Sequence, residues 1–210
     1  MKRKKHFILL ACFTAYMSVA SAQPEFTAEV SQLFPTFKFK DSEGVKHNDD
    51  YQSLITGAYG IGLRYILESG IFFKAGLGMR NAGANLVYDQ VNYAWRMQYG
   101  DIKLGLGYRT KFKTVKPYFV ASGYYATLLR GTQTLHNQTL NILKSGILKN
   151  QDLGVQFTPG IDIRFTEYFS SYLEFNYLMG LSNIELGSAQ KATNSALGVN
   201  IGIAVLLLAK

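Results

Sequence analysis

The sequence predicts an all-β protein, a closed antiparallel up-and-down transmembrane β-barrel of about eight strands. Three observations predict it: apolar residues recur with period two, the opposite face of these segments is rich in glycine, and an export signal comes first. Only 17% of the 210 residues are charged, while tyrosine and phenylalanine (14 each) and glycine (20) are plentiful. After residue 22, no segment approaches the ~20 consecutive apolar residues that a membrane helix needs. An exported apolar chain of this kind is expected to cross a bilayer with strands.

Residues 1–22 contain the three parts of a secretory signal peptide in the correct order. Residues 2–5 are all Lys or Arg, Phe7–Val19 are mostly apolar, and Ala20–Ala22 form a cleavage site that makes Gln23 the first mature residue. Two alternatives stay open: an uncleaved membrane anchor, and a lipoprotein signal with Cys12 as the lipidated residue. We therefore predict a signal peptide over 1–22 and one barrel domain over 23–210.

Loss of the signal peptide changes the charge and the cysteine count. Removing the four cations of residues 1–22, which contain no acids, lowers the formal net charge from +8 to +4. This charge is too small to predict a nucleic-acid partner. The single cysteine, Cys12, lies within the signal, so we expect no disulfide and no cysteine-ligated metal site in the mature chain. No cofactor is expected either.

Apolar alternation is regular in six segments of the mature chain. These are residues 59–67, 71–80, 102–109, 153–165, 173–181 and 197–207. Two less regular segments, 29–40 and 117–130, bring the number of predicted strands to about eight. Upstream of Asp101 the apolar parity changes, since Trp95, Met97 and Tyr99 are apolar or aromatic, and this change predicts a β-bulge near Gly100.

The second face of these strands indicates where the apolar face points. Glycine and small residues suit the crowded interior of a narrow barrel, so we place them inside and the apolar residues outside, against lipid. The alternative is a soluble lipocalin-like barrel with its apolar face inward. Short links at 68–70, 111–116 and 166–170 predict periplasmic turns, and segments 40–51, 84–94, 131–150 and 184–194 predict extracellular loops. A helical turn is expected within 131–150, because its apolar residues are otherwise unexplained.

Charged residues at the inward positions are the most informative polar side chains. We expect them to pair with one another in a lumen too narrow for bulk water, since unpaired charges there would be costly. An ion-selecting channel lining is the alternative interpretation. The predicted network consists of Arg64, Lys74, Arg80, Lys103, Arg109, Asp162, Arg164 and Glu174.

Aromatic residues near the strand ends are interpreted as anchors at the membrane–water interface. This set consists of Tyr59, Tyr65, Trp95, Tyr99, Tyr108 and Tyr118. The repeated Gly-x-Gly strings lie inside predicted strands, so they are assigned to the barrel interior and not to phosphate-binding loops. Lys111, Lys113 and Lys116 form a basic turn, which is either simply solvated or in contact with anionic head groups or periplasmic partners.

Catalytic chemistry has little support in the sequence. The mature chain has two histidines, His47 and His136, both in predicted extracellular loops. The string from His47 to Asp50 is compatible with the His/Asp pair of a hydrolase or with a weak cation site, but hydrated loop residues explain it equally. We therefore predict no catalytic, cofactor-binding or metal-binding residues.

The C-terminal half resembles a known family. Residues 116–123 (KPYFVASG) are similar to the KPY…G strand of the PorT-like outer-membrane barrels of Bacteroidota, and residues 177–184 (YLMGLSNI) to that family's Y-x-x-G-L-x-N-I strand and loop. Residues 154–165 and 101–108 fit the neighbouring strands, and the resemblance spans most of residues 23–210. It implies a small OmpA-type barrel of eight strands in the bacterial outer membrane. The family's namesake is linked to secretion and surface motility.

The leading hypothesis is a non-enzymatic integral outer-membrane barrel that anchors surface loops for envelope integrity or binding. An accessory component of a secretion or transport assembly is the alternative that the resemblance suggests. A narrow channel and an outer-membrane lipid- or peptide-modifying enzyme are further alternatives. Expected partners are outer-membrane lipid and envelope or secretion-system proteins, and the residues identify no small-molecule ligand.

Overall fold

The computed structural model describes residues 23–88, 91–135, 138–146, 148–187 and 189–207. The predicted signal peptide, with Cys12, and the loop residue His136 lie outside this set, so the signal stays a prediction. The long strands are β1 (Gln23–Lys40), β3 (Thr56–Ile66), β4 (Ile71–Tyr88), β5 (Val91–Arg109), β6 (Val115–Leu135), β8 (Gln151–Arg164), β9 (Phe169–Gly180) and β10 (Lys191–Leu206). The short elements are η1 (Asn48–Asp50), β2 (Tyr51–Gln52), β7 (Gln138–Asn141) and α2 (Ile142–Ser145).

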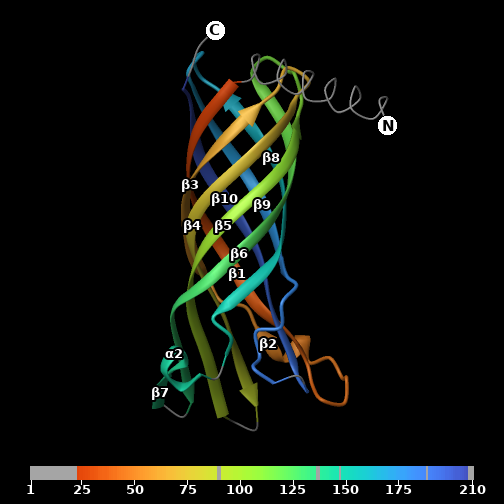
Figure 1. The fold of residues 1–210 in the computed structure, drawn as a ribbon, viewed down its shortest axis with the longest axis vertical. Helices are drawn as coiled ribbons and strands as arrows, with labels where there is room; N and C mark the ends of the chain where they lie inside the picture. The colour runs from red at the N-terminus through yellow and green to blue at the C-terminus, as the bar shows by residue number, and fades with distance from the viewer. Residues whose placement is uncertain (1–22, 89–90, 136–137, 147, 188, 208–210) are drawn as a thin grey trace, which may run out of the picture.

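The eight long strands form a closed ring of antiparallel pairs (Figure 1). Each long strand is hydrogen-bonded to the next, and β1 pairs with β10 along its whole length, from Glu25 opposite Leu206 to Lys40 opposite Lys191. The short strands β2 and β7 add pairs to β4 and β6. The predicted antiparallel barrel of about eight strands is therefore confirmed.

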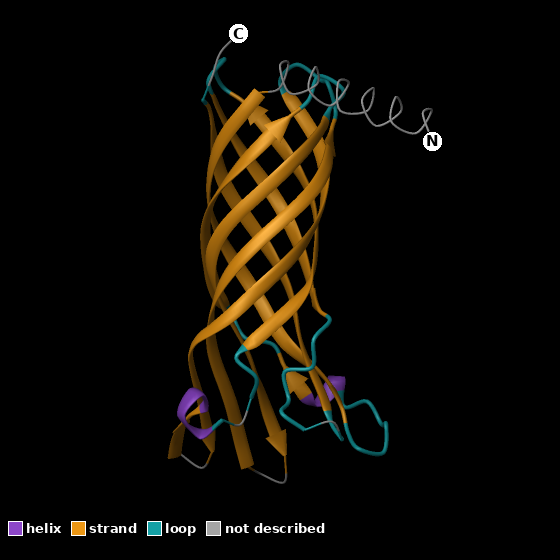
Figure 2. Ribbon diagram, in the orientation of Figure 1, coloured by secondary structure: helices purple, strands orange, loops and turns teal. Residues whose placement is uncertain are grey.

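The two ends of the barrel differ (Figure 2). At the turn end, where β1 begins and β10 ends, short connections join β3 to β4, β5 to β6 and β8 to β9. At the loop end, the strands run on beyond the main cylinder and carry η1, β2, β7 and α2. The predicted grouping of short turns at one end and long connections at the other is present.

Successive residues of each long strand point to opposite sides of the barrel wall. Outward positions in the central part are apolar and exposed, as for Leu104, which is 66% exposed, and Val30. On β1 the outward residues from Phe26 to Phe34 are apolar except for Gln32, over a length close to the ~9–11 residues of a tilted transmembrane strand. No helix among the described residues is long and apolar enough to span a membrane.

On β5 the apolar face changes side part-way along the strand. Ile102 to Tyr108 expose apolar side chains outward, whereas Met97 and Tyr99 are buried inside the barrel and Arg96 is exposed. Burial alternates without interruption from Met97 to Tyr99 and on to Asp101, so the strand does not turn over. The environment of its outer face changes instead. From Ile102 onward the outward side chains are suited to contact with lipid, and before Ile102 they are suited to contact with water.

The β-bulge predicted on β5 near Gly100 therefore needs correction. A register shift is present between Gln98 and Tyr99, but the partners of these residues are Arg130 and Leu128, which leaves Leu129 as the extra residue on β6. Because the bulged strand is β6, the bulge does not explain the change of apolar parity on β5.

The loop predicted over residues 84–94 is also wrong. β4 continues to Tyr88 and β5 starts at Val91, because this segment forms a long hairpin in continuous register, with Asn85 opposite Ala94. The helical turn predicted within 131–150 is confirmed as α2. The side chain of Asn141 caps it by accepting a hydrogen bond from the backbone N–H of Lys144, at 3.1 Å.

Candidate functional site

The lumen nearest the turn end is filled by a first layer of ion pairs. The guanidinium of Arg64 donates to both carboxylate oxygens of Asp162, with N···O distances of 3.1 Å. Arg109 bridges Asp162 and Glu25, at 3.1 and 3.2 Å. Arg64 also lies 4.7 Å from the ring centre of Tyr172 and is 1% exposed. Two cations and two acids thus neutralise each other across strands from opposite sides of the ring.

A second layer is centred on one lysine. The ammonium of Lys74 lies 3.0 Å from Glu29 and 3.1 Å from Glu174. Glu174 also accepts hydrogen bonds from the hydroxyl of Tyr118 at 2.7 Å and from the side-chain amide of Asn200 at 2.9 Å. Every oxygen of this fully buried carboxylate therefore has a donor, as a buried charge requires.

A third layer lies closer to the loop end. Arg80 donates to Asp101 at 3.0 Å and to Asp152 at 2.6 Å. Asp152 also accepts from the hydroxyl of Tyr124 at 3.2 Å and from the amide of Asn194 at 2.9 Å. These charge-assisted bonds join β4, β5, β6, β8 and β10 across the lumen.

Glycine makes room for the tyrosines that cross the lumen. A Cβ at Gly202 would collide with the ring of Tyr172, and a Cβ at Gly154 with the ring of Tyr124. Between the second and third layers lies a polar cavity of about 30 Å³, beside Lys103 and Ser122. This volume has room for roughly two water molecules.

Above the third layer an apolar core closes the loop end. Its buried side chains come from β1, β4, β5, β6, β9 and β10, and from α2 and the connections over this end. They are Phe37, Ala82, Ala84, Met97, Tyr99, Tyr124, Ala126, Leu128, Ile142, Leu148, Leu178, Ile184, Ala192 and Ala196. The interior therefore changes from ion pairs to a hydrophobic core along one continuous barrel.

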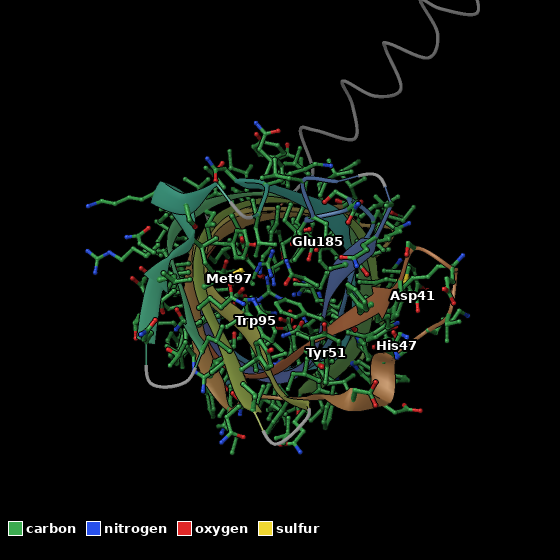
Figure 3. The ribbon with its side chains drawn as sticks, turned by 90° about the horizontal axis from the view of Figure 1, so that it is seen from below. Asp41, His47, Tyr51, Trp95, Met97 and Glu185 are labelled. Atoms are coloured by element: carbon green, nitrogen blue, oxygen red, sulfur yellow. The ribbon has the colours of Figure 1, made fainter. Side chains whose placement is uncertain are left out.

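Aromatic rings gather at the rim of this core (Figure 3). Tyr93 stacks on Trp95 with centroids 5.9 Å apart, and Tyr51 contacts Trp95 at 5.9 Å and Phe37 at 5.8 Å. We call Phe39, Tyr51, Tyr93 and Trp95, all half-buried, the mouth aromatics. Seen from the loop end, Trp95 and Tyr51 lie around the barrel opening with Glu185 across from them.

A histidine clasp fixes the connection between β1 and β2. Nε2 of His47 lies 2.9 Å from Asp41, and its Nδ1 lies 3.2 Å from Asp50. Both ring nitrogens face carboxylates, which favours the protonated ring; the hydrogen bond to Asp41 is the largest cause that raises the pKa of His47 above 6.5. The same hydrogen bond lowers the pKa of Asp41. Asn48 supports the clasp by accepting from the backbone N–H of Phe39 at 3.0 Å.

Glu185 adds a partly buried carboxylate to the mouth. Burial raises the pKa of Glu185. Burial, followed by the charges of Glu185 and Asp50, raises the pKa of Tyr51 to about 12. The charges of Glu185 and Asp50 thus act on Tyr51, so this rim carries acidic groups as well as aromatic rings.

This cylinder, with lipid-facing apolar strands and a filled lumen, agrees with the comparisons with known proteins. Residues 21–185 match the family described as outer membrane protein beta-barrel domain. The chain belongs to this family. No curated protein matches it significantly.

Two solved outer-membrane barrels have a similar fold. Neisserial surface protein A (NspA) shares 13% identity with a TM-score of 0.55, over 89% of this chain and 99% of that chain. The outer membrane protein OprG from Pseudomonas aeruginosa shares 12% identity with a TM-score of 0.55, over 90% of this chain and 97% of that chain. Outer-membrane barrels in general have short periplasmic turns and longer extracellular loops, which predicts that the turn end is periplasmic and the loop end extracellular.

The structure places most of the predicted charge network of this outer-membrane barrel inside the lumen. Arg64, Lys74, Arg80, Arg109, Asp162 and Glu174 form the ion pairs described above. Lys103 also points inward, but its ammonium lies 3.9 Å from Asp101, at the edge of pairing distance. Arg164 does not belong to the network: it is exposed at the turn end and donates to the backbone carbonyl of Glu167 at 3.0 Å.

Sequence reasoning missed four of the acids. Glu25, Glu29, Asp101 and Asp152 are four of the six acids in the three layers. The parity of β1 contains the signal that could have found Glu25 and Glu29, because both share the inward face with Thr27. The predicted strand began too late, at residue 29, to show that pattern.

The predicted interfacial aromatics lie in different parts of the barrel. Tyr59 and Tyr108 are more than half exposed on the outer surface, and Tyr65 is partly exposed. The anchor role is wrong for Tyr99 and Tyr118, which are buried in the lumen, and Trp95 belongs to the mouth aromatics. A tyrosine ring suits either place, so only its inward parity on the strand separates the two.

The histidine string holds no recognisable metal centre. Among the described residues, no group of three or more His, Cys, Asp or Glu side chains is arranged to hold a metal ion. His47 is occupied by its two carboxylate partners. His47 and its two carboxylate partners therefore hold this loop in place.

Proposed function

We propose that this protein is a non-conducting, non-enzymatic outer-membrane barrel that holds an ordered binding surface at its extracellular loop end. The observation that carries the proposal is the filled lumen: three layers of ion pairs and an apolar core follow one another along the axis. An ion passing through would have to displace arginine–carboxylate pairs that are buried and hydrogen-bonded, which costs several kcal/mol per broken pair.

The order of the loop end supports a binding role. The histidine clasp pins residues 41–50, and the side chain of Asn183 donates to the carbonyls of Gly187 and Gln190 while accepting from the backbone N–H groups of Glu185 and Ala192. A surface that is ordered before binding loses less entropy when a partner docks. Half-buried tyrosine and tryptophan rings are also enriched in binding surfaces.

The mouth aromatics and their neighbouring acids suggest the chemistry of the partner. Tyr51 contacts Trp95, and the charges of Asp50 and Glu185 act on Tyr51. Aromatic faces and carboxylates both attract cationic groups. We therefore propose a partner that presents cationic and apolar groups together, with outer-membrane lipid surrounding the barrel wall.

The test combines conductance with complementation. Protein reconstituted in planar bilayers is expected to give no discrete current steps, and reproducible steps would overturn the non-conducting assignment. In a deletion strain, wild-type protein and a control variant with Tyr59→Ala and Tyr108→Ala on the lipid face are expected to restore the surface phenotype. The variant with Tyr51→Ala and Trp95→Ala is expected not to restore this phenotype, although it is present as folded protein in the same amount as wild type. Full rescue by that variant would mean that the barrel alone serves envelope integrity.

A modifying enzyme is the less favoured alternative, and His47 is its test. Both ring nitrogens of His47 are engaged by carboxylates, so neither is free to act as a general base. We expect His47→Gln to leave any envelope modification unchanged. Loss of a lipid or peptide modification in this variant would favour the enzyme.

We also propose that the chain is a PorT-like barrel of Bacteroidota, with the two motifs as the support. In the structure these motifs have architectural roles: Tyr118 holds Glu174, Asn183 ties the loop before β10, and Ile184 is fully buried. Motif residues with such roles support a shared fold more directly than a shared secretion role. Normal secretion and motility in a deletion strain would remove the accessory-component alternative.

A further inference from the structure

The periplasmic turn end contains a basic hollow that the ion-pair layers do not use. It has a volume of about 230 Å³ and is lined by the β3–β4 turn, the β5–β6 turn and the start of β1. Three of its lining residues are cations: Arg109, Lys111 and Lys116. We call this space the basic hollow.

Arg109 is already neutralised, but the two lysines are not. The guanidinium of Arg109 is shared between Glu25 and Asp162 in the first layer. Lys116 lies opposite Asp162 in the strand register, yet that carboxylate is occupied by two arginines. Within the described part of the chain, neither Lys111 nor Lys116 has an ion pair or a side-chain hydrogen bond.

Charges of both signs lie near the hollow. Lys116 is partly buried; Arg109 and Arg164 repel it, and the acids Asp162 and Glu25, which the arginines already occupy, attract it more weakly. Glu68, the acid that lines the hollow, has an interaction of its own. A hollow with surplus cations and restricted solvent attracts an anion more strongly than a flat surface does.

The height of the hollow along the barrel indicates which anion it meets. Phe112, at the tip of the β5–β6 turn, is 65% exposed and is flanked by Lys111 and Lys113. An exposed aromatic ring between two lysines suits the membrane–water boundary, with the ring toward the acyl chains and the ammonium groups toward the head groups. The hollow therefore opens at the level where phospholipid phosphates lie.

We propose that the basic hollow binds a phosphate group, held by Lys111 and Lys116. The phosphate belongs either to a phospholipid head group of the periplasmic leaflet or to a soluble phosphate ester of the periplasm. The inference is independent of the binding role of the loop end, since the two sites lie at opposite ends of the barrel.

The test uses the full protein in nanodiscs of mixed phosphatidylcholine and phosphatidylglycerol, and separately with glycerol 3-phosphate in solution. Native mass spectrometry counts the retained molecules of each phospholipid, because both carry a phosphate, and isothermal titration measures glycerol 3-phosphate. Lys111→Gln combined with Lys116→Gln is expected to weaken binding about thirtyfold, because each lysine near a phosphate layer contributes about fivefold. The matched control, Lys144→Gln combined with Lys149→Gln, removes the same charge at the loop end and should bind like wild type.

The outcomes separate the sources. Retention of either phospholipid without binding of glycerol 3-phosphate assigns the site to lipid, and binding of both a phospholipid and glycerol 3-phosphate assigns it to phosphate esters in general. Equal loss in the two double variants, or no binding in wild type, overturns the proposal. If the double variant does not fold, Lys111→Gln alone changes only the exposed turn and is expected to weaken binding about fivefold.

Discussion

At the scale of single residues, the buried acids show how the lumen is held together. Glu174 on β9 accepts from Lys74 on β4, Tyr118 on β6 and Asn200 on β10. One carboxylate therefore joins four strands. Because all its partners are donors, a neutral side chain of the same shape cannot replace it.

The first prediction concerns this carboxylate. Glu174→Gln leaves Lys74 with one acid instead of two and places an amide N–H₂ against other donors, so we expect it to destabilise the barrel by about 3 kcal/mol. Unfolding by urea in lipid vesicles measures the change. Glu167→Gln, in the exposed β8–β9 turn, is the matched control and should stay within about 0.5 kcal/mol of wild type. Equal stability of the two variants would contradict a structural role for the network.

The second prediction concerns the pH dependence of the histidine clasp. The pKa of His47 is raised in the folded protein, so its contribution is complete below the unfolded value of 6.5 and is lost as pH rises through the folded pKa. The pKa of Asp41 is lowered, so its contribution is present above 3.8 and is lost as pH falls through the folded pKa. NMR titration of His47 should show the raised pKa, with backbone amides of residues 41–50 more protected at pH 5.5 than at pH 8.5. His47→Gln should abolish this difference, and a free-histidine pKa would contradict the clasp.

Much of the charge network could be predicted from parity, but its pairings could not. Arg64 and Asp162 are 98 residues apart, and which inward residue meets which depends on the tilt and stagger of the strands. Asp101 and Asp152 were missed because each lies one residue before a predicted strand, which began at 102 or at 153. Tyr118 was predicted to face outward because Tyr118 and Phe119 are both aromatic. The sequence alone does not show which of the two side chains points into the lumen.

At the scale of elements, the outward residues of β5 indicate which part of the strand lies in the membrane. Its outward residues are apolar from Ile102 to Tyr108 and polar at Arg96 and Gln98. The period-two pattern predicted the first part well. The second part was assigned to a loop and a bulge, because a face that changes from lipid to water resembles a break in the strand.

The third prediction tests this boundary. Leu104→Lys places a charge on the lipid face near the middle of the apolar segment and should destabilise the barrel by about 2–4 kcal/mol. Gln98→Lys makes the same side chain on the same face of β5, outside the apolar segment, and should change stability by about 0–1 kcal/mol. Reversible folding into lipid vesicles measures both. Similar costs at the two sites would place the membrane elsewhere.

At the scale of the whole molecule, the pairing of the first and last strands closes the ring. Val30 lies opposite Ile201, and both face outward. Closure leaves no unpaired sheet edge within the membrane, where each unsatisfied backbone group would be costly. The sequence predicted closure only through the number of strands and the need to satisfy their backbone groups.

The fourth prediction is a cross-link across the closure. With Cys12 replaced by serine, Val30→Cys and Ile201→Cys should form a disulfide in the folded protein, because directly opposed residues of an antiparallel pair have suitable Cβ separation. A change of gel mobility under non-reducing conditions reports it. Val30→Cys with Phe175→Cys, one strand further away, is the control and should not cross-link. Equal cross-linking of both pairs would argue against the closed register.

The alternation of faces has a consequence for how the chain reaches its membrane. A polar or glycine residue at nearly every second position keeps each strand below the ~20 continuous apolar residues that an inner membrane retains as a helix. The same arginines and carboxylates that lie paired in the finished lumen are hydrated in the extended chain. Since every layer draws on strands far apart in sequence, those charges lose their water only when the ring closes. The unfolded chain thus stays hydrated during export and becomes a membrane protein only when it folds in the outer membrane.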